Sequence, residues 1–148
     1  MNIQTKFHGE LTIQQDQTWA FPKGMPGFEE ESEFALLPIE DNDIFQVLQS
    51  TKTPTVAFII INPYTIVEDY SFKVDEPTVN LLDIKEESDV FVLGVLSVKE
   101  PFETSTINLQ APLIFHVTTR KAKQMILNDN AFSMRHPIGT QLTTKGEA

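Results

Sequence analysis

The sequence predicts an all-β fold, mainly antiparallel, in the form of a small β-barrel-like domain with one or two short helices. Short segments rich in Val, Ile, Phe and Thr recur at close spacing, as is typical of strands. Pro, Asp, Asn and Thr, which favour turns, separate them. The segments 56–61 and 90–96 are apolar on both faces, so we expect them at the centre of the sheet.

The strands follow from alternating apolar and polar residues. In "FHGELTI" (7–13) the two kinds alternate, and "TWAF" (18–21) follows after a polar turn, so these segments are predicted to pair as a hairpin. Trp19 and most of the eleven Phe residues are expected to fill the interior. Further strands are predicted at 34–38, 45–50, 55–62, 70–74 and 90–98.

A short helix is predicted in "EPTVNLLDI" (76–84), where Asp75 or Glu76 serves as the cap and Pro77 falls in the first turn. Segment 119–130 is ambiguous because Ala122 and its apolar neighbours fit a helix, whereas "LIFHVTT" followed by "KQMIL" fits a hairpin. We predict the hairpin, since the preceding strand pattern is strong and the gap is short.

The chain has 148 residues, which predicts one domain over 1–138, followed by a mobile C-terminal tail at 139–148. The absence of cysteine excludes disulfides, thiolate metal sites and a cysteine nucleophile. We expect a cytoplasmic protein without a membrane segment. The N-terminus does not resemble a signal peptide, and the longest apolar run, "VAFIII", is too short to span a bilayer.

The net charge of −10 argues against direct nucleic-acid binding, which needs clustered Lys and Arg. Seven acids and no base lie in 29–43, and eight acids with two lysines lie in 68–89. The negative electrostatic potential of these stretches favours encounter with a basic partner, although an acidic surface can also serve only to keep a protein soluble.

No motif for catalysis is found. The histidines at 8, 116 and 136 have no metal-ligand spacing, and the nucleotide-binding and GxSxG patterns are absent. Acid pairs such as Glu86–Glu87 lie among polar residues and not in the desolvated surroundings that catalytic carboxylates usually need. We therefore expect neither an enzyme nor a cofactor or metal.

Two motifs are specific when they occur together. The pattern "FxxGxPGF" is matched by Phe21, Gly24, Pro26, Gly27 and Phe28, and the pattern "TxNLxAPL" is matched by Thr106, Asn108, Leu109, Ala111, Pro112 and Leu113. With "FQVLQS" (45–50), "FIIINP" (58–63), "EDY" (68–70) and "KQMIL" (123–127), they resemble the FliW family of flagellar assembly factors over essentially the whole chain.

This resemblance implies a non-enzymatic protein with two protein partners, flagellin and the carbon storage regulator CsrA, a small dimeric RNA-binding protein that represses flagellin translation. Free assembly factor would bind CsrA and relieve repression, and accumulating flagellin would displace it. The resemblance also implies that CsrA is inhibited away from its RNA-contacting surface.

We hypothesise that acidic residues form the CsrA-facing surface, because an RNA-binding regulator is expected to carry basic surface. The residues are Glu68, Asp69, Asp75, Glu76, Glu86 and Glu87. The alternative is that they are only solvated loops.

The segment "STINLQAPLIF" (105–115) also allows two interpretations. Asn108 could satisfy buried backbone groups at a corner that Pro112 introduces, or the segment could offer an open edge to a flagellin terminus. We favour the first. Other functions remain possible: a flagellin chaperone without CsrA binding, or a ligand-binding barrel with a cavity lined by Phe58, Phe91 and Phe115.

Overall fold

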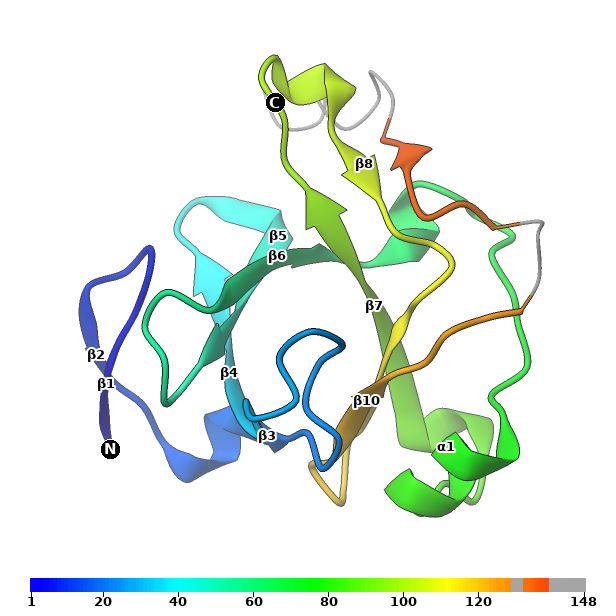
Figure 1. The fold of residues 1–148 in the computed structure, drawn as a ribbon, viewed down its shortest axis with the longest axis horizontal. Coiled ribbons are helices and arrows are strands. Elements are labelled where there is room, and N and C mark those ends of the chain that lie inside the picture. Colours follow the sequence, from blue (N-terminus) through cyan, green and yellow to red (C-terminus); the bar gives the residue numbers. More distant parts are fainter. Residues whose placement is uncertain (129–131, 139–148) are drawn as a thin grey trace.

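One antiparallel sheet forms the framework of the computed structural model, which describes residues 1–128 and 132–138 (Figure 1). Its strands follow the order β10-β9-β7-β6-β5-β4-β3. Their bounds are β3 (Thr18–Ala20), β4 (Glu33–Ile39), β5 (Asn42–Ser50), β6 (Ala57–Ile61), β7 (Val90–Ser97), β9 (Leu113–His116) and β10 (Ala122–Gln124). The mainly antiparallel all-β prediction is confirmed, and β6 and β7 are central, as their two apolar faces indicated.

Smaller elements surround this sheet. β1 (Asn2–Gln4) and β2 (Glu10–Thr12) form a separate ribbon, and β8 (Thr106–Ile107) pairs with both β7 and β11 (His136–Pro137). The helix α1 (Glu76–Leu82) begins one residue after Asp75, which confirms the helix predicted at 76–84. Short 3₁₀ helices are η1 (Gln15–Gln17), η2 (Pro63–Thr65), η3 (Glu87–Asp89) and η4 (Phe102–Thr104).

The sheet curls until its two outer strands meet at one point. The Ala20 N–H donates a 2.8 Å hydrogen bond to the Arg120 carbonyl, and Ala20 forms an isolated parallel bridge with Lys121. The Arg120 guanidinium lies 3.8 Å from the centroid of the Trp19 ring and donates to the Asp16 and Thr18 carbonyls. The architecture is therefore barrel-like without the continuous ladder of a closed barrel.

Aromatic side chains fill the interior. Trp19 meets Phe91 and Phe115 edge to face, and the Phe91 and Phe115 rings stack with their centroids 5.0 Å apart. Phe21 and Phe34 pack beside them and are fully buried. The prediction that Trp19 and phenylalanines form the core is confirmed for these residues.

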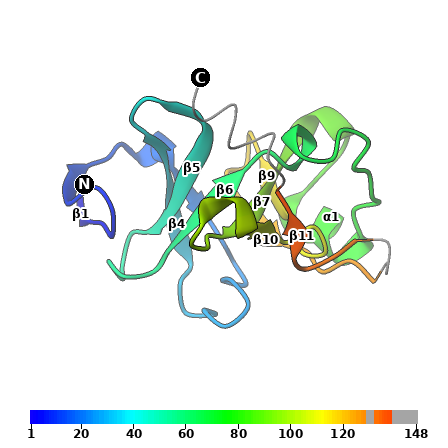
Figure 2. The ribbon, with the colours of Figure 1, turned by 90° about the horizontal axis from the view of Figure 1, so that it is seen from above.

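The loop between β3 and β4 covers one opening of the ring, as Figures 1 and 2 show from two directions. It consists of two tight turns, in which the Phe21 carbonyl accepts from the Gly24 N–H and the Met25 carbonyl from the Phe28 N–H. Pro26 and Gly27 occupy the centre of the second turn, where the positive φ of Gly27 suits a type II turn. Met25 is buried in the core cluster, so the "FxxGxPGF" motif builds a cap on the core.

Two predicted features of local structure are wrong. The hairpin between 7–13 and 18–21 does not form, because β2 pairs with β1, and η1 then directs β3 to β4. Segment 70–74 is not a strand, because nothing pairs with it among the described residues. The choice of a hairpin for 119–130 is confirmed by the pairing of β9 with β10 at Ala122–Gln124, whereas 125–128 are not strand and 129–130 lie outside the described residues. The predicted tail at 139–148 lies outside the described residues, and the single domain over 1–138 stays a prediction.

Candidate protein-interaction groove

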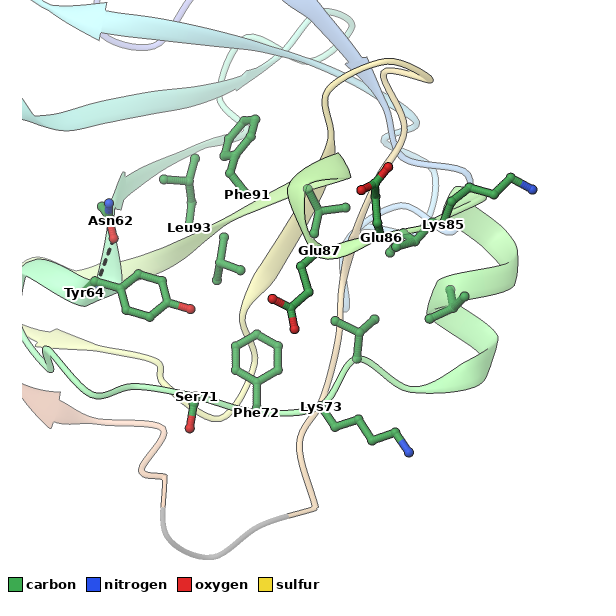
Figure 3. Close-up of a pocket in the computed structure, with 15 residues that line it drawn as sticks. Asn62, Tyr64, Ser71, Phe72, Lys73, Lys85, Glu86, Glu87, Phe91 and Leu93 are labelled. Atoms are coloured by element: carbon green, nitrogen blue, oxygen red, sulfur yellow. Dashed lines mark hydrogen bonds between the residues drawn. The ribbon is translucent and has the colours of Figure 1, made fainter.

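A groove with a volume of about 720 Å³ lies beside β7 (Figure 3). The opposite wall is the irregular segment 71–74, and the end of the groove is formed by α1 and the turn at 84–87. Most of its lining is apolar, with charged side chains at the rim. The lining residues are Asn62, Tyr64, Ser71, Phe72, Lys73, Val74, Val79, Ile84, Lys85, Glu86, Glu87, Val90, Phe91, Val92 and Leu93.

The groove runs along the edge of β7. Consecutive residues of a strand point to opposite faces of the sheet, yet Val90, Phe91, Val92 and Leu93 all line the same groove. In Figure 3, Phe91 and Leu93 project from one side of the strand, and Phe72 and Glu87 point toward one another beside it. A space lined by both faces of a strand lies beside the strand, where its backbone is accessible.

The end of β6 opens this edge. β6 pairs with β7 only through Ile60 with Val95 and Ile61 with Gly94. The next residue, Asn62, accepts a 2.9 Å hydrogen bond from the Tyr64 N–H through its side chain and caps η2. The chain therefore turns away from β7, and Tyr64 is left 41% exposed at the groove.

Asp75 fixes the start of α1. Its carboxylate accepts a 2.9 Å hydrogen bond from the Thr78 N–H, which is the usual N-cap interaction. Burial acts to raise the pKa of Asp75, but the hydrogen bonds from Thr78 and the nearby Lys123 charge lower it on balance. Asp75 thus has a structural role in addition to any role in binding.

The turn before β7 is organised by Asp89. Its Oδ2 atom accepts from the N–H groups of Lys85 at 2.8 Å and Glu86 at 3.0 Å, and these bonds lower the pKa of the Asp89 carboxyl. The Nε2 atom of His116 lies 3.8 Å from the same oxygen. Asp89 thus holds the backbone of this turn, and the side chains of Glu86 and Glu87 are exposed at the rim of the groove.

The structure brings together some of the predicted acidic residues. Glu86 and Glu87 line the groove, whereas Asp75 and Glu76 lie at the start of α1, between the lining residues Val74 and Val79 in the chain. Glu68 and Asp69 lie in the preceding loop and do not line the groove. All six are exposed, and their role in binding stays a prediction.

Sequence reasoning missed the apolar part of the groove. Tyr64 was not singled out, Phe72 and Val74 were assigned to a strand, and Val90 and Val92 were treated only as core. The alternation of Tyr70, Phe72 and Val74 was the available signal, because it shows that the segment presents apolar side chains to one side.

The second motif forms a corner beneath the groove wall. The Asn108 side chain accepts from the N–H groups of Gln110 at 3.0 Å and Ala111 at 3.1 Å. The Tyr70 hydroxyl donates a 2.6 Å bond to the buried Leu109 carbonyl, and burial raises the Tyr70 pKa. The "EDY" and "TxNLxAPL" motifs are thus joined directly, and Asn108 satisfies backbone groups at the corner.

The described residues contain neither a helix long and apolar enough to cross a membrane nor a cluster of three or more His, Asp or Glu side chains suited to a metal ion. The fold and the groove define a curled antiparallel β protein with an open, mostly apolar groove beside β7.

Comparisons with known proteins identify the family. The family model described as FliW protein matches residues 2–138. The flagellar assembly factor FliW of Bacillus licheniformis is 45% identical over 139 residues, which cover 94% of this chain and 97% of the relative. The Bacillus subtilis protein of the same name is 42% identical with the same coverage. A crystal structure of the flagellar assembly factor FliW matches with a TM-score of 0.89 and 37% identity, covering 94% of this chain and 97% of that chain. The chain belongs to the FliW family.

Proposed function

We propose that this protein is a cytoplasmic flagellar assembly factor that switches between two protein partners. It binds flagellin, and when free of flagellin it binds and antagonises CsrA, relieving repression of flagellin synthesis. Accumulating flagellin occupies the factor and returns CsrA to its repressing state. The observation that carries the proposal is the family match over residues 2–138, which includes both specific motifs.

The acidic charge supports a basic partner such as an RNA-binding regulator. The net charge is −10, and Glu68, Asp69, Asp75, Glu76, Glu86 and Glu87 are all exposed. Exposed charges contribute little to holding a complex together but raise its association rate, and salt screens that contribution. We therefore assign these residues mainly to the encounter with CsrA.

Calorimetric titration with purified CsrA, repeated with flagellin already bound and at two salt concentrations, tests the switch. The proposal predicts binding to CsrA that weakens with salt and is abolished by flagellin. Heat with flagellin alone would favour a dedicated chaperone that does not bind the regulator. No heat with either protein would overturn the proposal.

A matched pair of variants tests the acidic surface. In the first, Glu68, Glu86 and Glu87 are changed to Gln. In the second, the exposed residues Glu10, Glu40 and Glu103, none of which lines the groove, are changed to Gln. The net charge changes equally, so a lower association rate and weaker salt dependence in the first variant alone would localise the effect. Equal behaviour of both variants would show that only overall charge matters.

A further inference from the structure

Part of β7 is paired on one side only. Val90 to Leu93 pair with β9 along one edge, whereas the pairing of the other edge with β6 covers only Gly94 and Val95. Within residues 1–128 and 132–138, no strand pairs with the second edge of Val90–Leu93. This unpaired edge is the one that faces the groove.

The hydrogen bonds that β7 makes show which of its backbone N–H and C=O groups face the groove. The Asp89 carbonyl accepts from the Val117 N–H at 2.9 Å, on the β9 side. Backbone groups alternate in direction along a strand, so those of Phe91 and Leu93 also face β9, and those of Val90 and Val92 face the groove. The Val90 N–H already donates to the Glu87 carbonyl. The Val90 carbonyl and both backbone groups of Val92 are left for a ligand.

We propose that this edge takes up an extended segment of a partner protein, which adds a strand beside Val90–Leu93 and carries apolar residues flanked by Lys or Arg. The added strand would continue along β7 from the point where β6 leaves it at Ile61. Unpaired strand edges are templates for such addition, in which the backbone supplies hydrogen bonds and adjoining pockets select side chains.

The residues that line the groove indicate which side chains the partner segment should carry. Phe72, Val92 and the neighbouring apolar residues line the space and favour apolar side chains. The exposed carboxylates of Glu86 and Glu87 at the rim favour basic flanking residues. The positive charge of Lys85 offsets little of the negative charge of Glu86 and Glu87, because the Lys85 ammonium group lies 3.3 Å from the Asp83 carboxylate. This inference rests on the proposed function, and the preference for basic flanking residues assigns the segment to CsrA, the RNA-binding partner.

Amide hydrogen exchange measured by NMR tests the site directly. ¹⁵N-labelled protein is measured alone and in complex with unlabelled purified flagellin or CsrA. In the free protein the Phe91 and Leu93 amides should exchange slowly and the Val92 amide fast. In the complex with CsrA the Val92 amide should slow by roughly tenfold or more, as expected for a newly formed ladder hydrogen bond, whereas slowing with flagellin alone would overturn the assignment to CsrA.

The alternative results are distinct. A CsrA complex that forms while Val92 still exchanges fast would overturn the added strand and leave the proposed function intact. If neither partner binds, both proposals fail. Protection of Val92 in the free protein that rises with its concentration would assign the edge to a second copy of this chain and overturn the proposal.

A substitution provides a second test. Val92→Pro removes the N–H that faces the groove, and proline is tolerated on an unpaired edge because no ladder bond is lost there. Val92→Thr keeps the N–H and serves as the control. We expect at least tenfold weaker partner binding for Val92→Pro alone, with unchanged near-UV circular dichroism. Unchanged binding by folded Val92→Pro would refute the proposal, and if that variant fails to fold, the exchange result decides.

Discussion

The glycines of the capping loop offer a test of how the "FxxGxPGF" motif fixes the fold. Gly24 has φ +64°, and a Cβ atom added there would lie 2.6 Å from both the Cα atom and the carbonyl oxygen of Glu29. Gly27 and Gly9 also have positive φ, at +86° and +68°, but a Cβ at either position would meet nothing within 4 Å. A substitution at Gly9 or Gly27 therefore tests backbone strain alone, whereas a substitution at Gly24 tests strain together with a steric clash.

Replacing each glycine by alanine should give two sizes of effect. A left-handed conformation costs an L-residue about 1–2 kcal/mol, partly offset by about 0.4–1 kcal/mol from the lower entropy of the unfolded chain. Gly9→Ala and Gly27→Ala should thus each lose about 1 kcal/mol. Gly24→Ala must also displace the Glu29 backbone, and overpacking of this kind costs about 1–3 kcal/mol more. We expect a total of about 2–4 kcal/mol for Gly24→Ala.

Urea unfolding followed by fluorescence measures these differences. Trp19 is the single tryptophan, and it is buried in the core cluster that Met25 of the loop also joins. The midpoint should fall most for Gly24→Ala, and an unchanged slope would show that the unfolded surface is the same. If Gly24→Ala is no less stable than Gly27→Ala, the contact with Glu29 does not constrain the loop, and the steric reasoning is wrong.

Three further substitutions test the corner and the helix. Tyr70→Phe removes the donor to the buried Leu109 carbonyl and should cost about 1–3 kcal/mol in urea unfolding; a loss below about 0.5 kcal/mol would show that the carbonyl is satisfied otherwise. Asn108→Ala leaves two N–H groups without their acceptor and should cost a similar amount, about 1–3 kcal/mol, whereas Asn108→Asp, which keeps the acceptor, should cost less. Asp75→Asn tests the cap through pH. Because the native pKa of Asp75 is lowered, its stabilisation is present above the unfolded pKa of about 3.9 and is lost as pH falls through the native value. Wild-type stability should therefore fall more steeply than that of Asp75→Asn below about pH 5, and parallel profiles would contradict this assignment.

The central strands could be predicted because the apolar residues within each strand indicate that it is buried. β6 and β7 are apolar on both faces, and such segments have few stable positions other than the middle of a sheet. The α1 helix was equally accessible, since Asp75 and Pro77 mark its start. In these cases the residues that determine the element are all within it.

The errors arose where pairing depends on distant segments. Tyr70, Phe72 and Val74 alternate with polar residues as a strand would, but alternation reports only which side is buried. A ladder also requires a neighbour at the right distance, and segment 70–74 has none among the described residues. The β1–β2 ribbon shows the same limit, because the three residues of β1 give too short a pattern to reveal the partner of β2.

The groove was inaccessible to sequence reasoning for a related reason, although its cause can be read in hindsight. Its lining comes from five separated parts of the chain, which no local pattern connects. The edge of β7 is open because β6 stops, and β6 stops at "FIIINP", where Asn62 caps η2 and Pro63 has no N–H with which to extend a ladder. A β6 that continued past Ile61 would cover Val90–Leu93 and fill the space that the groove now occupies. The two motifs therefore have different structural roles. "FIIINP" ends β6 early and leaves an edge of β7 free, and "FxxGxPGF" folds a loop over one opening of the ring. With a partner strand added at this edge, the short β6 is a binding feature, and the residues that terminate it, Asn62 and Pro63, contribute to partner recognition as the acidic rim does.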